Sequence, residues 1–219
     1  MKRLLAFAVL FVLAGGMVAY ADIVSYNDPA HQGTQTFGGN LALTFNVNSP
    51  VTIDALGVFN ASGTGVVTGP IQVVIYDTTT NQEVTPVVTF SGTYTPAALG
   101  YDVFQSITPV VLGPGSYEVD AVGFGSPDSN GNLNTGSSSG PMLNNFGGAL
   151  TFTGAAWDYS GTLDDPTTCS TCQPMPAQAS QFDAGTFSVV PDASFYEVLG
   201  VLGVCMAGFL FVVRRRRSA

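Results

Sequence analysis

Basic residues are almost absent from the middle of this 219-residue chain. Six Lys and Arg residues stand against 15 Asp and Glu residues, and no Lys or Arg occurs between Ile23 and Val213. Proteins bind a phosphate backbone through basic side chains that neutralise the phosphates, so this composition excludes a nucleic-acid partner. It also excludes Lys or Arg salt bridges within the segment. Divalent cations are therefore the obvious counterions for its acidic groups.

The segment 22–189 carries a large uncompensated negative charge. Of the acidic residues, only Asp192 and Glu197 lie outside it, which leaves thirteen inside and a net charge of about −13. Such a charge favours solubility and repulsion from anionic surfaces. The segment is long enough to form one domain with a hydrophobic core of its own.

Histidine is equally scarce, which argues against nucleophilic catalysis. Residues 136–140 read Gly-Ser-Ser-Ser-Gly and fit the G-x-S-x-G pattern of a nucleophile elbow. That motif requires a sharp strand-to-helix turn with His and Asp partners further along the chain. Here no helix is expected after the motif, and the single histidine, His31, lies far upstream. A flexible Ser/Gly loop is the better interpretation.

Cysteine occurs three times, and two of the three form a C-x-x-C pair, Cys169 and Cys172. A redox motif of this kind needs a helix N-terminus to lower a thiol pKa, and the following Gln-Pro-Met-Pro is a poor helix start. Zinc would need two further ligands, and Cys205 lies in an apolar C-terminal run. A local disulfide is the favoured interpretation. Free thiols, or redox or metal chemistry, are the alternatives.

The N-terminus has the three parts of a secretory signal peptide. Lys2 and Arg3 precede an unbroken apolar run, 4–14, and Ala19 and Ala21 form an A-x-A signal-peptidase site. A membrane span needs about 20 apolar residues, so the run is too short to be one. We expect residues 1–21 to be a signal peptide that is cleaved before Asp22.

A longer apolar run ends the chain. Residues 195–213 are apolar except for Glu197, and Arg214, Arg215, Arg216 and Arg217 follow. Nineteen helical residues span roughly 28 Å, close to the thickness of the hydrocarbon core of a bilayer. Arginines that flank a span stay on the cytoplasmic side. We expect a membrane anchor here, with the preceding domain outside the inner membrane.

The residues before this run complete a three-part sequence pattern. A five-residue motif, an apolar helix and an arginine cluster follow one another here, and the motif is Val190, Pro191, Asp192, Ala193 and Ser194. This order resembles the PEP-CTERM sorting signal of exported proteins from exopolysaccharide-producing Gram-negative bacteria. The usual motif is Val-Pro-Glu-Pro-Ser, from which Asp192 and Ala193 depart. The resemblance implies that residues 190–219 are recognised by an exosortase, an intramembrane cysteine protease. It also implies sorting to the cell surface or extracellular matrix.

Short alternating segments predict an all-β fold for the domain between. The strand-like segments are 34–48, 52–59, 71–77, 84–90, 101–108, 116–124 and 186–190, separated by Gly, Pro, Asn, Ser and Thr. This pattern indicates a β-sandwich of about eight strands. Three stretches, "FNVNSPVTIDALGVFNASGTG", "IQVVIYDTTTNQEV" and "VVLGPGSYEVDAVGF", resemble β-sandwich ectodomains common among PEP-CTERM proteins. That resemblance implies a fold and no catalytic residues.

Two groups of oxygen-bearing side chains could hold ligands. Asp128, Asn130 and Asn132 alternate as calcium ligands do, although no bidentate Glu follows and an Asn/Gly turn explains them as well. Glu118 and Asp120 share one face of a strand, and Asp164 adjoins Asp165. Glycosidases use such carboxylate pairs, but the solvated face of a sheet is the simpler interpretation.

These observations predict a non-enzymatic, exported protein of the cell surface or matrix, associated with exopolysaccharide. The alternatives are a carbohydrate-active enzyme that uses a carboxylate pair, and a calcium-dependent adhesive or carbohydrate-binding module. No cofactor is expected, with calcium as the alternative. The expected partners are the membrane, the exosortase and exopolysaccharide.

Overall fold

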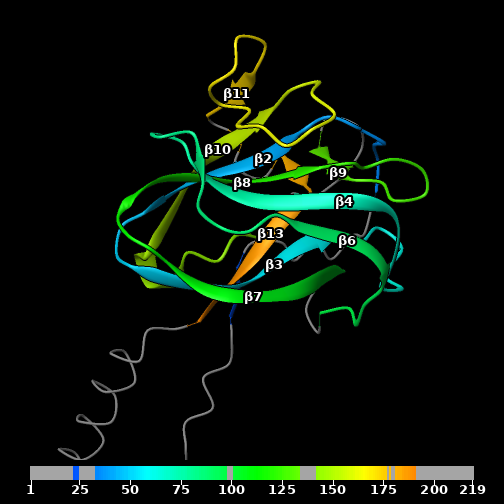
Figure 1. Ribbon diagram of the computed structural model, residues 1–219, viewed down its shortest axis with the longest axis horizontal. Coiled ribbons are helices and arrows are strands. Elements are labelled where there is room, and N and C mark those ends of the chain that lie inside the picture. Colours follow the sequence, from blue (N-terminus) through cyan, green and yellow to red (C-terminus); the bar gives the residue numbers. More distant parts are fainter. Residues whose placement is uncertain are drawn as a thin grey trace, which may run out of the picture. The chain divides into compact units, whose positions relative to one another are not determined.

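Strands make up nearly all the regular structure in the computed structural model of this chain (Figure 1). The structure describes residues 22–24, 33–97, 101–133, 142–176, 178 and 181–190. The elements in chain order are β1 (Asp22–Val24), β2 (Leu41–Val47), β3 (Val51–Phe59), β4 (Val66–Asp77), β5 (Gln82–Glu83), β6 (Val88–Thr93), β7 (Asp102–Leu112), β8 (Gly115–Val122), β9 (Gly131–Asn132), the 3-10 turn η2 (Phe146–Gly148), β10 (Leu150–Trp157), β11 (Gln173–Met175), β12 (Phe182–Asp183) and β13 (Gly185–Val190).

The strands form two larger sheets and one small one. The larger has the order β11-β10-β2-β8-β4-β5, and β6 also pairs with β4. The second has the order β1-β13-β3-β7, and β9 pairs with β12. Every one of these pairings is antiparallel. In Figure 1 both large sheets curl, with β10, β2, β8 and β4 on one side and β13, β3 and β7 on the other. The prediction of an all-β fold is confirmed.

One hydrophobic core is shared by the two large sheets. Side chains alternate between the faces of a strand, so β2 sends Leu41, Leu43, Phe45 and Val47 to one face, where all four are buried. Phe45 meets Phe187 of the other sheet with ring centroids 4.9 Å apart. The alternation in the sequence is thus the cause of the core, because each sheet has one face that must leave water.

The strand β10 was not among the predicted segments. Its sequence, Leu-Thr-Phe-Thr-Gly-Ala-Ala-Trp, contains Gly154 in the interior, and the pairing of β10 with β2 shifts register between Phe152 and Gly154. Such a bulge interrupts the period of two on which a sequence-based prediction depends. This strand matters most for the site, because it leads directly into the segment that covers the sheet.

One compact unit comprises Ala21–Val190. Its last strand, β13, continues through Val190, the first residue of the expected sorting motif, which pairs with Thr52. Several expected features lie outside the described residues, namely the signal peptide with Ala19 and Ala21, His31, the 136–140 loop, Pro191 to Ser194, the apolar run 195–213 and Arg214 to Arg217. Among the residues that the structure does describe, no helix is long and apolar enough to cross a bilayer.

Candidate functional site

Two acidic side chains lie on the face of the larger sheet that points away from the core. In β8, Tyr117, Val119 and Ala121 belong to the hydrophobic core. Glu118 and Asp120 alternate with them and therefore lie on the opposite face. Glu118 stands between Thr44 of β2 and Tyr76 of β4, and Asp120 stands between Ala42 and Val74.

The expectation that this acidic face is solvated is wrong. Glu118 and Asp120 are both 0% exposed. Asp165, which is also buried, lies within hydrogen-bonding reach of Glu118, and the charges of Asp158 and Asp164 act on Asp120. These three residues belong to the segment 158–172 between β10 and β11, which we call the covering loop. The covering loop therefore closes over the acidic face, a long-range contact that local sequence patterns do not predict.

Asn40, just before β2, attaches the covering loop to the sheet. Its side-chain Nδ2 donates to Asp158 Oδ1 at 3.2 Å and to the Thr162 carbonyl at 2.8 Å, and it also contacts Asp164 Oδ1. The Asp158 backbone N–H donates to the Asn40 carbonyl at 3.3 Å. The side chain itself is 0% exposed. Nothing in the local sequence distinguishes Asn40 from a turn residue, so it was not among the predicted site residues.

Six buried oxygens in this cluster accept no hydrogen bond from the protein. They are both carboxyl oxygens of Glu118, both of Asp120, Oδ2 of Asp165 and the amide oxygen of Asn40. Two ionised carboxylates are both acceptors, so Glu118 and Asp165 cannot satisfy each other without a proton or a cation between them. Buried polar atoms are nearly always paired, which makes these oxygens exceptional.

Burial and mutual repulsion make these groups hard to ionise. Burial, followed by the Asp165, Asp120 and Asp158 carboxyls, raises the pKa of Glu118 to about 11. Burial, and then Asp158 and Asp164, raises the pKa of Asp120 well above its usual range. The pKa of Asp164 rises for the same reasons, burial first and the Asp158 charge second. The shared cause is negative charge held away from water without a basic neighbour.

The tyrosine across from Glu118 responds to the same environment. Burial, and next the Asp120 charge, raises the pKa of the Tyr76 hydroxyl. Its hydroxyl therefore stays protonated at neutral pH. Tyr76 adds a neutral polar group, and no positive charge, to this face of the sheet.

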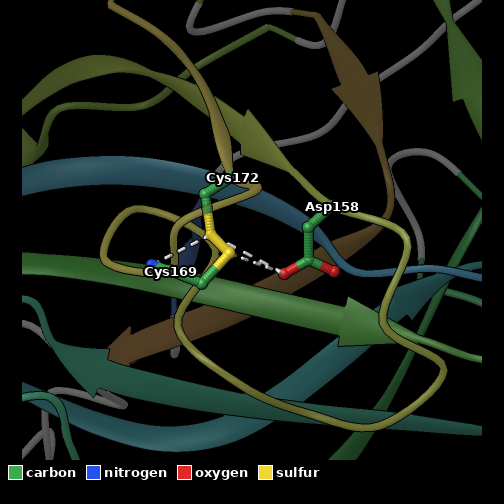
Figure 2. Close-up of side chains that lie close together, drawn as sticks. All are labelled: Asp158, Cys169 and Cys172. Atoms are coloured by element: carbon green, nitrogen blue, oxygen red, sulfur yellow. Dashed lines mark hydrogen bonds between the residues drawn. A yellow bond between two sulfur atoms is a disulfide. The ribbon is translucent and has the colours of Figure 1, made fainter.

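A disulfide joins Cys169 and Cys172 within the covering loop. Figure 2 shows the Asp158 carboxylate pointing toward the two sulfurs, with Oδ2 at 3.7 Å from Cys169 Sγ and 3.8 Å from Cys172 Sγ. Oxidised sulfurs carry no hydrogen, so these contacts do not satisfy the carboxylate as an N–H or O–H donor would. The three side chains bring potential ligand atoms within 4.8 Å of one another, but the sulfurs here are not thiolates.

The second feature is an aromatic pocket, which is lined in part by the core residues Leu41 and Phe182. Its volume is about 180 Å³, and its lining residues are Gln35, Phe37, Leu41, Asn132, Trp157, Tyr159, Met175 and Phe182. The Trp157 and Tyr159 rings meet edge to face at 5.1 Å, and Phe37 meets Trp157 at 5.8 Å. Tyr159 is 79% exposed. Trp157 and Tyr159 flank Asp158 in the chain, so one short segment contributes to both the pocket and the acidic cluster.

The residues considered as calcium ligands from the sequence bond to the protein instead. Asp128 Oδ2 accepts from the backbone N–H groups of Thr68 at 2.8 Å and Gly69 at 2.7 Å. Asn130 Oδ1 accepts from the Phe37 N–H at 3.2 Å.

The side-chain amides of Asn130 and Asn132 both bond to Gln35, which lines the aromatic pocket. The Nδ2 groups of Asn130 and Asn132 both donate to Gln35 Oε1, at 3.1 and 2.9 Å, and Gln181 donates to Asn132 Oδ1 at 2.5 Å. These side chains therefore fix the wall of the aromatic pocket, and we place no cation among them.

Known proteins give no guide to the function of this chain, so a functional assignment depends on the geometry described above. The chain matches no protein-family model and no curated protein.

Proposed function

We propose that this chain is an exported, non-enzymatic protein of the cell surface or extracellular matrix. Its β-sandwich ectodomain would bind a neutral sugar unit of an exopolysaccharide in the aromatic pocket. One observation carries the proposal: Phe37, Trp157 and Tyr159 gather around an open pocket whose polar groups are amides.

The chemistry of the pocket suits a sugar. Aromatic rings offer flat apolar surfaces with a polar edge, and ligand sites combine such surfaces with a few placed hydrogen-bonding groups. Here the rings come with the side-chain amides of Gln35 and Asn132 and with no charged group. The strongly acidic ectodomain repels polyanions, which is why we propose a neutral sugar. The volume of about 180 Å³ allows one small unit to enter.

The proposed location follows from the ends of the chain. Residues 1–21 would direct export, the run 195–213 with the arginine cluster would hold the protein in the inner membrane, and an exosortase would process the signal that begins at Val190. Support comes from the order of these parts in the sequence. It also comes from the folded domain, whose last strand, β13, ends at Val190, the first residue of the motif.

The carboxylate pair does not favour an enzyme. Glycosidases place their two acids on either side of the sugar bond that they cleave. Glu118 and Asp120 are fully buried, and neither lines the aromatic pocket. A polysaccharide could reach them only after the covering loop had opened. The raised pKa values therefore have a simpler explanation in burial than in general acid catalysis.

Affinity for immobilised neutral and anionic polysaccharides tests this proposal. The full chain in detergent should bind a neutral polysaccharide, and Tyr159→Ala should weaken binding at least about tenfold, as loss of an aromatic anchor does. Tyr159 is mostly exposed, so the folded state should be unaffected. Val111→Ala, which shortens an exposed side chain of β7 that does not line the pocket, is the control and should bind normally. Unchanged binding by Tyr159→Ala would refute the pocket assignment.

A further inference from the structure

The acidic cluster places five carboxyl groups close together without a Lys or Arg to balance them. Glu118, Asp120, Asp158, Asp164 and Asp165 come together on one face of the larger sheet. The segment 22–190 contains no Lys and no Arg. A buried carboxylate without a partner is strongly unfavourable, and the usual solutions are a basic side chain, a proton or a metal ion. For the first of these, the segment offers no Lys or Arg.

Hydrogen bonds satisfy only the loop side of the cluster. Asp158 Oδ1 accepts from the Ser160 backbone N–H at 2.7 Å and from Asn40 Nδ2. Asp165 Oδ1 accepts from the Thr167 backbone N–H at 2.8 Å and from the Thr167 hydroxyl at 2.5 Å. The second oxygen of Asp165 accepts none. The covering loop thus holds its own carboxylates in place and leaves one oxygen directed at the sheet without a donor.

On the sheet side the carboxyl oxygens are poorly satisfied. Both oxygens of Glu118 and both of Asp120 lack a hydrogen-bond partner of good geometry, although the two side chains are completely buried. Only the adjacent Ala121 backbone offsets part of the cost of burying Asp120. Asn40 gives independent support, because it is neutral. Its amide nitrogen lies against Asp158 and Asp164, which places the side chain in the cluster, and its amide oxygen has no donor either. A neutral oxygen gains nothing from a shared proton between carboxylates, but it is a good ligand for a hard cation.

We propose that Glu118, Asp120 and Asp165 bind one calcium ion beneath the covering loop, with the Asn40 amide oxygen as a neutral ligand. Calcium takes six to eight oxygen ligands in flexible geometry and accepts bidentate carboxylates. The six unsatisfied oxygens of this cluster match that chemistry. Magnesium demands near-ideal octahedral geometry and retains water, and zinc and copper prefer nitrogen or sulfur, so these ions fit less well.

Binding would also tighten the covering loop. The carboxyls now form two close pairs, Glu118 with Asp165 and Asp158 with Asp164. Across the described residues, only Asp158 with the two disulfide cysteines brings three potential ligand atoms within 4.8 Å. An ion between β8 and Asp165 would draw the covering loop onto the sheet. Tyr159 of the aromatic pocket belongs to that loop, so calcium would order the pocket wall as well.

Direct measurement of bound metal tests the site. The full chain, purified in detergent and stripped with a chelator, is dialysed against calcium, and the bound ion is counted. We expect one calcium per chain. Thermal unfolding should shift upward by about 5–10 °C when free calcium is 100-fold above its Kd, because the ion binds only the folded state. Magnesium at the same concentration should give a smaller shift. No bound calcium at millimolar free calcium would overturn the proposal.

Variants separate a calcium site from a purely structural cluster. Glu118→Gln and Asp120→Asn should each lose the bound ion and the thermal shift, yet unfold no earlier than the stripped wild type, because a buried carboxyl is replaced by a neutral amide. Glu83→Gln, the same change at an exposed position of the same sheet, should keep both. If Glu118→Gln does not fold, Asp165→Asn on the covering loop gives the same readout. Wild-type calcium binding by these variants would overturn the assignment.

Discussion

At the residue scale, Gly39 controls how closely the covering loop approaches β2. A Cβ built on Gly39 would lie 2.1 Å from the Asp158 carbonyl oxygen and 2.8 Å from the Phe37 ring. Both neighbours are parts of the site, because Asp158 belongs to the acidic cluster and Phe37 lines the aromatic pocket. The loop can therefore lie against the strand only because this position has no side chain.

Gly39→Ala should accordingly destabilise the fold and loosen the site. We expect a loss of about 1–3 kcal/mol in the free energy of unfolding, the usual cost of overpacking, measured by denaturant titration. Gly161→Ala, in the covering loop itself, is the control, since its Cβ would meet nothing within 4 Å. It should change stability by less than about 0.5 kcal/mol. Equal stability of the two variants would show that the close approach at Gly39 does not constrain the loop.

The sequence was enough to predict that Glu118 and Asp120 lie on one face of a strand, but not that this face is buried. The period of two was enough to place Glu118 and Asp120 on one face of a strand. Whether that face is wet depends on residues 158–172, some forty positions later, and local alternation contains no information about what covers a sheet. The absence of Lys and Arg was the stronger signal. It suggested divalent counterions before the structure brought these acids together.

At the element scale, the covering loop is held by its disulfide and by Asn40. The Cys169–Cys172 bridge closes a short loop next to Asp158, and the Cys169 backbone N–H donates to Cys172 Sγ at 3.1 Å. The loop has no regular secondary structure before β11. Its order therefore depends on a few side-chain contacts, which makes it sensitive to their loss.

Removal of the disulfide should loosen the covering loop selectively. Cys169→Ser combined with Cys172→Ser should lower the free energy of unfolding by about 2 kcal/mol, as expected for a short closed loop. Backbone amides of residues 158–172 should exchange hydrogen faster, while those of β2 and β8 should not. Cys205→Ser is the matched control and should leave both measurements unchanged. Uniform exchange across the domain would contradict the assignment of the disulfide to this loop alone.

The core strands should respond differently from the covering loop to a substitution, because their buried side chains contact both sheets. Phe45 of β2 is fully buried and stacks on Tyr117 at 5.9 Å as well as on Phe187. Phe45→Ala should cost about 3–5 kcal/mol in global stability, measured by thermal or denaturant unfolding. Val111→Ala on β7, 66% exposed, should cost almost nothing. A small loss for Phe45→Ala would mean that the shared core is less tightly packed than the structure indicates.

At the scale of the whole molecule, hydrophobic alternation established the class of fold and not its topology. It identified β3, β8 and β13 to within two residues of their observed bounds. The predicted segment 34–48 begins well before β2, the segments 71–77 and 101–108 cover only parts of β4 and β7, and 84–90 overlaps only the start of β6. Alternation could not reveal that β10 pairs with β2, more than a hundred residues earlier, because it names no partner. The two-residue strands β5, β9 and β12 are shorter than any periodic signal. The acidic cluster depends on that β10 pairing, so it was equally hidden.

The clearest prediction for the whole molecule concerns its export. The protein is expressed in a host that has an exosortase, with an epitope tag after Ala219. The tag and the folded ectodomain are each detected with an antibody in the membrane and matrix fractions. We expect the ectodomain in the matrix without the tag, because the sorting signal would be removed beyond β13. Pro191→Ala, just outside the last strand, should retain both signals in the membrane without unfolding the domain. If the wild type also keeps both in the inner membrane, then Asp192 and Ala193 have inactivated the signal, and the protein is an anchored periplasmic domain.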